Sequence, residues 1–78
     1  MAKTYIAADM RLYDKDMAKK YGMHIEAYNN NVIKKINETI DDEEDYVLLC
    51  GTISTGSTIG TLHLISQIKA KKIIFKRD

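Results

Sequence analysis

The sequence is poor in the residues that staple small proteins together. Its 78 residues include one cysteine, Cys50, and no proline or tryptophan. A single cysteine excludes an internal disulfide and is typical of a reducing compartment. With only two histidines beside it, a structural zinc site would need carboxylates for its remaining ligands. We therefore expect no cofactor, and we expect stability to come from packing or from oligomerisation.

Long apolar runs are absent as well. No run approaches the ~20 residues that a membrane-spanning helix needs. The first residues, from Met1 to Ile6, hold no apolar stretch long enough for a signal peptide. We expect a cytoplasmic protein with no membrane partner.

The charge is almost balanced, because 12 basic and 11 acidic residues leave a net charge of +1. Such a chain has no overall field that attracts nucleic acid or a membrane surface. Apolar residues at 45% and charged residues at 29% are ordinary for a globular protein. We expect one domain that spans residues 1–78. Basic side chains near the end could contact nucleic-acid phosphates, but the one aromatic among them, Phe75, is expected to be buried in a strand.

The pattern of apolar residues predicts alternating strands and helices. Short apolar runs favour strands at residues 4–8, 46–50 and 73–75. Helical spacing predicts a helix over residues 25–40, and the weakly periodic segment 10–24 could add one or two helical turns before Gly22. A last short helix is indicated by apolar residues at a spacing of three: Ile59, Leu62, Ile65 and Ile68. The order β-α-α-β-α-β predicts an α/β fold, a small three-stranded, mostly parallel sheet with two or three helices.

The segment 46–50 is apolar at both parities, which predicts a strand buried on both faces. Two helices are too few to cover both faces of the sheet. We therefore predict a homodimer in which a second copy covers the open face. The alternative is a monomer in which residues 10–24 fold over that face as a third helix.

Ligand sites of open α/β sheets lie beyond the carboxyl ends of the strands, and three segments are expected there: Asp9 to Arg11, Gly51 to Ser57, and Lys76 to Asp78. Asp9 ends the first strand, and Gly51 and Gly56 follow the second. This arrangement resembles the N-terminal half of the calcineurin-like metallophosphoesterases over nearly the whole chain. In that family the first strand ends in Asp-x-His, the second in Gly-Asp, and the third in Gly-Asn-His-Asp or -Glu. Those residues hold two catalytic metal ions.

The family's metal ligands are mostly replaced in this sequence. Asp9 keeps the first aspartate, but Arg11 stands where the histidine is expected and Thr52 where the second aspartate is expected. The third motif is missing. A guanidinium cannot ligate a cation, and one carboxylate cannot assemble a two-metal site. The resemblance thus implies a single truncated phosphoesterase-like domain that is not an enzyme and holds no metal.

Other roles for these loops remain open. Arg11 could meet solvent, pair with Asp9 and steady the loop, or bind an acidic partner. The spacing of Gly51 and Gly56 is similar to that of a phosphate-binding loop, but Ser57 stands where such a loop needs lysine. Ser57 or Thr58 is then expected as the N-cap of the following helix.

We expect a non-catalytic binding protein that docks on another macromolecule, most simply a protein. By analogy alone, inhibitors of host defence encoded by phages or mobile elements, such as anti-CRISPR proteins, are of this size and style. The alternatives are a metal-dependent phosphoesterase rebuilt in a dimer, or a truncated or engineered fragment of one. The candidate interaction residues are Asp9, Arg11, Thr52, Ser54, Lys71, Lys72, Lys76 and Arg77.

Overall fold

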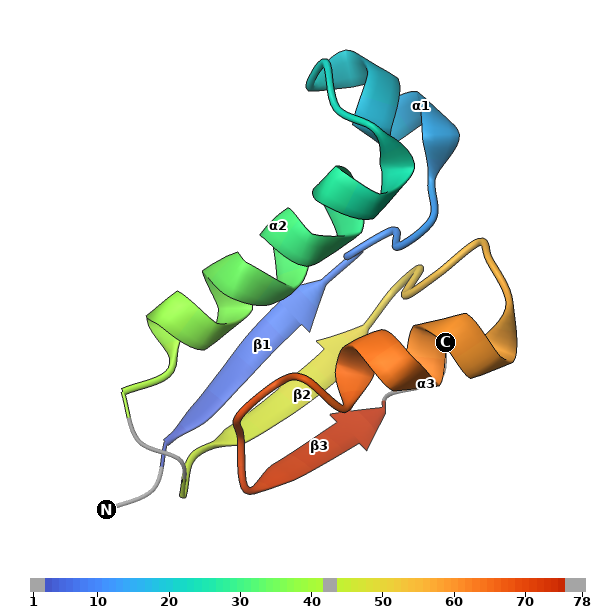
Figure 1. The fold of residues 1–78 in the computed structure, drawn as a ribbon. Coiled ribbons are helices and arrows are strands. Elements are labelled where there is room, and N and C mark those ends of the chain that lie inside the picture. Colours follow the sequence, from blue (N-terminus) through green and yellow to red (C-terminus); the bar gives the residue numbers. More distant parts are fainter. Residues whose placement is uncertain (1–2, 42–43, 76–78) are drawn as a thin grey trace.

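The computed structural model describes residues 3–41 and 44–75. Its elements follow the order β-α-α-β-α-β, which confirms the predicted fold (Figure 1). The chain runs through these elements in turn: β1 (Thr4–Ala8), α1 (Lys15–Lys20), α2 (Ile25–Thr39), β2 (Tyr46–Cys50), α3 (Thr58–Ile65) and β3 (Lys72–Phe75). All pairs in the sheet are parallel and the strand order is β1-β2-β3.

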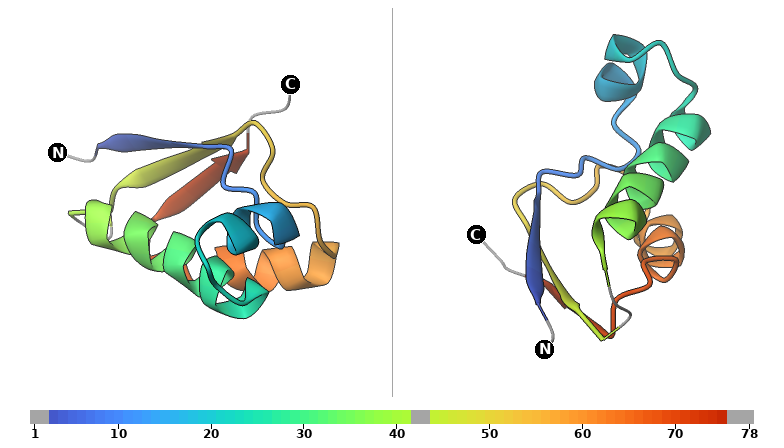
Figure 2. Two further views of the ribbon diagram at one scale, coloured as in Figure 1. Left: turned by 90° about the horizontal axis from the view of Figure 1, so that it is seen from above. Right: turned by 90° about the vertical axis from the view of Figure 1, so that its left-hand side faces the viewer.

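Both long crossovers place their helices on the same side of the sheet. The strand order never reverses, so two right-handed crossovers that advance in one direction leave α2 and α3 on one face. Figure 2 shows the resulting two layers, a sheet and a single layer of helices. The fold is half of a doubly covered α/β sandwich.

Local signals explain where the short helices begin and end. Asp14 caps α1 by accepting the backbone N–H groups of Asp16 at 2.9 Å and Met17 at 3.2 Å. Ser57 caps α3 by accepting the N–H of Gly60 at 3.1 Å, as predicted. Helix α1 ends just before Gly22, which has a φ of 66°, a conformation that favours glycine.

The core lies between the sheet and the two longer helices. Val47 and Leu49 on the inner face of β2, and Leu12 from the loop after β1, are completely buried. The helices supply most of the rest: Ile33 from α2, Leu64 and Ile65 from α3, and Ile40 and Ile68 just after them.

No described residue covers the other face of the sheet. In the single chain only the inner residues of β2 are buried. The apolar run 4–8 also predicted a buried strand, but β1 alternates between exposed and half-buried residues. On this face Ile6 is 69% and Ile74 is 39% exposed. Phe75, which pairs with Leu49 on the inner face, is 53% exposed at the end of β3 and not buried as expected. Apolarity at both parities thus coincides with a face that the single chain leaves open, and its covering by a second copy stays a prediction.

Helix α1 lies beyond the carboxyl end of the sheet beside α2 (Figure 1), so residues 10–24 do not fold over the open face, contrary to the alternative considered from the sequence. The predicted stripe along α3 is only half buried. Ile65 and Ile68 are each 5% exposed, whereas Ile59 is 84% and Leu62 is 54% exposed. Leu64 is buried beside Ile65. Among the described residues, no helix is long and apolar enough to cross a bilayer.

Candidate functional site

The loops that follow β1 and β2 run side by side past the carboxyl end of the sheet. Backbone hydrogen bonds continue the ladder there, from Arg11 N to Thr52 O at 3.1 Å and from Leu12 N to Ile53 O at 2.9 Å. The sheet thus positions both loops, because each is an extension of a strand. Candidate residues from two distant segments of the sequence meet here, as expected from the topology. They are Asp9 and Arg11 after β1, and Thr52 and Ser54 after β2.

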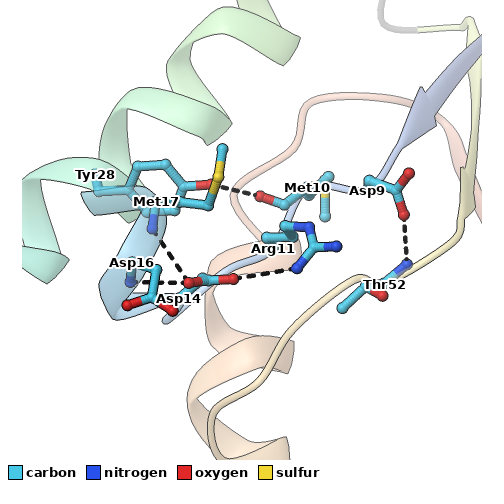
Figure 3. Close-up of polar contacts among 8 residues, drawn as sticks. All are labelled: Asp9, Met10, Arg11, Asp14, Asp16, Met17, Tyr28 and Thr52. Atoms are coloured by element: carbon cyan, nitrogen blue, oxygen red, sulfur yellow. Dashed lines mark hydrogen bonds and ion pairs between the residues drawn. The ribbon is translucent and has the colours of Figure 1, made fainter. Parts of the chain in front are cut away.

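Asp9 acts as a link between the two loops. Its Oδ1 accepts the backbone N–H of Thr52 at 2.9 Å (Figure 3). Gly51 makes this approach possible, because a Cβ at that position would collide with the Asp9 carboxylate. Gly51 also has a φ of 70°, in the left-handed region where glycine is favoured. One carboxylate oxygen of the aspartate that the resemblance assigns to metal binding therefore accepts a backbone hydrogen bond.

Arg11 does not pair with Asp9, which corrects one of the sequence hypotheses. Its Nη1 lies 3.4 Å from Oδ2 of Asp14 instead (Figure 3). The pKa of Asp14 is lowered, first by the hydrogen bond from the Met17 N–H and also by Arg11. The Arg11 side chain is still 45% exposed, so its charge faces both the α1 cap and the solvent.

Hydroxyl groups organise the loop between β2 and α3. Ser54 Oγ accepts the Gly56 N–H at 3.0 Å and lies 2.7 Å from Thr61 Oγ1. The Thr61 hydroxyl donates to the Ser57 carbonyl, which is also 2.7 Å away. Amides that a bound phosphate would need, those of Gly56 and Gly60, thus already have acceptors within the loop. The ring of Tyr13 packs against both glycines, where a side chain would collide with it. The loop is a tight turn, one of the roles expected for its glycines.

Helix α2 anchors the loop after β1 through two side chains that sequence reasoning missed. Asn29, only 3% exposed, accepts the backbone N–H of Tyr13 at 2.8 Å. Tyr28 donates its hydroxyl to the Met10 carbonyl at 2.9 Å (Figure 3), and burial raises the pKa of that phenol. The position of Tyr28 on the apolar stripe was the only sequence signal for either contact.

Backbone strain is concentrated in the same loop. Asp9, Arg11 and Tyr13 have φ values of 52°, 50° and 63°, a region that costs residues with a Cβ of order 1 kcal/mol each. The strain persists because the hydrogen bonds from β2's loop and from Asn29 define the path of the chain. No residue type in the sequence signals this conformation.

Of the basic candidates, Lys71 does not join this site. It precedes β3 at the opposite end of the sheet, where its Nζ lies 2.9 Å from the carboxylate of Glu44, and this contact raises the pKa of Lys71. Lys72 begins β3, but its side chain lies outside the described part of the chain. Lys76 and Arg77 lie outside the described residues altogether. Among the candidates whose side chains are described, Lys71 is therefore apart from the other four.

Within residues 3–41 and 44–75, no group of three or more histidine, cysteine or acidic side chains could hold a metal ion together. Set against known proteins, the chain matches no protein-family model, no curated protein and no solved structure. The resemblance to the calcineurin-like metallophosphoesterases stays a prediction from the residues. What the site shows by itself is a set of strained loops held together by internal hydrogen bonds.

Proposed function

We propose that this chain is a non-catalytic binding protein that docks on another protein through the uncovered face of its sheet. We call this surface the outer face; its described residues are Thr4, Ile6, Ala8, Tyr46, Leu48, Cys50 and Ile74. None of these seven side chains is charged at neutral pH. Parallel sheets are almost always covered on both faces. The bare outer face is the observation that carries the proposal.

The composition of the outer face favours a protein as the partner. Nucleic-acid surfaces need positive charge at the contact, and this face offers apolar and aromatic groups. An inhibitor of another protein is one role expected from the sequence. In that role the target protein would cover the outer face when the two proteins bind.

In the isolated protein a second copy covers the outer face, which gives the homodimer. The seven described side chains can meet their own copies about a two-fold axis without bringing like charges together. Three strands of about five residues span a footprint of only roughly 250 Å², whereas a stable complex buries about 800 Å² on each partner. The dimer is therefore weak, and a protein with a larger complementary surface displaces the second copy.

Light scattering behind size exclusion tests the pairing. At tens of micromolar we expect the mass to rise above the 8.9 kDa of one chain towards twice that value. Leu48→Lys places a charge on the outer face and should hold the mass at one chain, whereas Ala27→Lys, at an exposed position on α2, should not. A mass of one chain at every concentration contradicts the dimer.

Metal content and turnover test the non-catalytic part of the proposal. Purified protein should hold no stoichiometric Mn, Fe, Zn or Ni and should not hydrolyse bis-phosphodiester model substrates. One tightly held equivalent of metal, with turnover that is lost in Asp9→Ala, would favour the phosphoesterase rebuilt in a dimer.

A further inference from the structure

The outward edge of β1 carries backbone groups that no described strand pairs. β1 has β2 as its single neighbour in the sheet. Lys3 O accepts the Tyr46 N–H at 2.8 Å and Asp9 N donates to Cys50 O at 3.0 Å, so the odd-numbered residues of the strand face β2. Backbone direction alternates with each residue of a strand. The N–H and C=O groups of Thr4, Ile6 and Ala8 therefore point away from the sheet.

Beside this edge, between β1 and α2, lies an apolar groove made of two adjoining hollows. One of about 230 Å³ lies near Tyr5 and Ile6, and the other of about 290 Å³ lies near the end of the strand. They share Ala7, Lys35 and Ile36 as lining residues. Farther along, the second hollow ends at the stacked rings of Tyr21 and Tyr28, whose centroids are 6.4 Å apart. The groove thus follows the strand edge and ends at aromatic rings.

These two features fit the same occupant. The free backbone groups repeat every second residue, about 6.6 Å apart, which is the repeat of an extended chain. A strand added at this edge would turn every second side chain towards α2, into the hollows, and the others towards the outer face beside Ile6. Lys35, which makes no ion pair with any described residue, lines both hollows and favours an acidic side chain on the occupant.

A second copy of the chain fits the groove less well than a free segment. Pairing β1 with β1 about a two-fold axis through Ile6 would satisfy the backbone groups. It would also bring two α2 helices together, because α2 lies on the side of β1 away from β2 (Figure 1). The two Lys35 side chains that line the groove would then approach the same axis, and like charges oppose each other there.

We propose that the groove between β1 and α2 binds an extended segment of a partner protein, which adds as a fourth strand beside β1 with apolar side chains in the hollows and an acidic one at Lys35. Addition of a strand to an open edge is a common mode of peptide recognition. The proposal rests on the proposed function only in taking a protein as the partner. It uses the edge of β1 and the groove beside α2, which share only Ile6 and Ala8 with the outer face among their lining residues.

The probe is a peptide, blocked at both ends, in which leucine, leucine and glutamate alternate with serine, together with the same peptide in reversed order. Amide hydrogen exchange followed by NMR gives the readout. We expect the amides of Thr4, Ile6 and Ala8 to exchange at least about tenfold more slowly when the better of the two peptides is saturating. Slower exchange that appears without peptide and grows with protein concentration would show a second copy at the edge, and would overturn the proposal. So would exchange that neither peptide slows.

A charge exchange tests the role of Lys35. In Lys35→Glu the affinity for the glutamate peptide should fall by about two- to fivefold, and a lysine version of the peptide should gain by a similar factor. The matched control is Lys34→Glu, because Lys34 lies on the same helix, pairs with Glu38 at 3.8 Å and does not line either hollow. If Lys35→Glu and Lys34→Glu change the affinities for the peptides equally, the proposed contact between the acidic side chain and Lys35 is contradicted.

Leu48→Lys separates this proposal from the proposed function. It removes pairing through the outer face but leaves the edge of β1 intact. Peptide protection that survives in this variant supports the groove whatever the outcome of the dimer experiment. If Leu48→Lys abolishes both the dimer and the protection by the peptide, the peptide binds to the outer face, and the proposal of a binding groove beside β1 is overturned.

Discussion

The contact of Asp9 with Gly51 leaves no room for a side chain at position 51. Gly51 has both a left-handed backbone and no space for a side chain beside the Asp9 carboxylate. Gly22 has a similar φ of 66° but no atom within 4 Å of its missing Cβ. A side chain at position 22 would therefore cost only the free energy of a left-handed backbone. A side chain at position 51 would also collide with the Asp9 carboxylate.

Alanine at each glycine should show this difference. Gly22→Ala should lower the free energy of unfolding by about 1 kcal/mol, the cost of a left-handed residue with a Cβ. Gly51→Ala should cost at least about 1 kcal/mol more, because the carboxylate must also move. Urea denaturation measures both, and adding Asp9→Ala should recover the excess at position 51. Equal costs for the two glycines would mean that the carboxylate moves freely.

The charge of Asp14 links the α1 cap to pH. Its pKa is lowered in the folded protein, first by the Met17 N–H, so the folded state holds the ionised form more tightly than the unfolded chain does. This contribution to stability is present above the ordinary carboxyl pKa and is lost as the pH falls through the lowered folded value. We expect Asp14→Asn, which keeps a capping oxygen, to reduce the loss of stability between pH 6 and about pH 2. Urea midpoints of both proteins across this range check the sign, and parallel curves would contradict it.

At the scale of elements, α2 contributes both to the core and to the position of the loop after β1. One side of the helix packs on the sheet through Ile33 and Ile36, and its first turns hold the loop after β1 through Tyr28 and Asn29. A helix that does both couples the core to the carboxyl end of the sheet. The coupling runs through the buried amide of Asn29 and the hydroxyl of Tyr28.

Replacing that amide should be costly. Asn29→Ala leaves the backbone N–H of Tyr13 without its acceptor, and an unsatisfied buried donor costs about 1–3 kcal/mol. Asn30→Ala changes the exposed neighbour on the same helix and should stay within about 0.5 kcal/mol. Thermal or urea denaturation compares the pair. Similar effects would mean that water replaces the amide of Asn29.

The two leucines of β2 test which face of the sheet is the core. Leu49 is completely buried on the inner face, whereas Leu48 lies half-buried on the outer face. Leu49→Ala should cost about 2–5 kcal/mol. In dilute protein Leu48→Ala should cost less than half of that, and its cost should grow with protein concentration if a second copy covers the face. A large cost for Leu48 that is independent of concentration would contradict an open outer face.

Strands and helices could be predicted from this sequence because each apolar run is short and bounded by polar residues. The runs at 4–8 and 46–50 coincide with β1 and β2, and Ser57 is the expected cap. The side of the sheet that is covered could not be predicted, because the direction of the crossovers and not the composition of β2 decides it. Arg11 took Asp14 as its partner because the α1 cap holds that carboxylate three residues away, whereas Asp9 turns towards Thr52.

For the whole molecule, strand order is the decisive property. A sheet that adds each new strand on the same side keeps all its helices on one face, and it leaves β1 and β3 as open edges of the described sheet. The outer face and the β1 edge both follow from this single fact. A variant that prevents dimer formation through the outer face, such as Leu48→Lys, should therefore leave the fold of the single chain unchanged.

The same strand order has a consequence for how the chain acquires its structure. Contacts between the start of β1 and β2 join residues 42 positions apart, so β1 has no partner until β2 has left the ribosome. Refolding should accordingly be slow for so short a chain, in the millisecond-to-second range of folds dominated by distant contacts. Because the sequence contains no proline, stopped-flow refolding should show no phase of tens of seconds from prolyl isomerisation. During synthesis, the open edge of β1 is the first surface on which a nascent chain could pair with its neighbour.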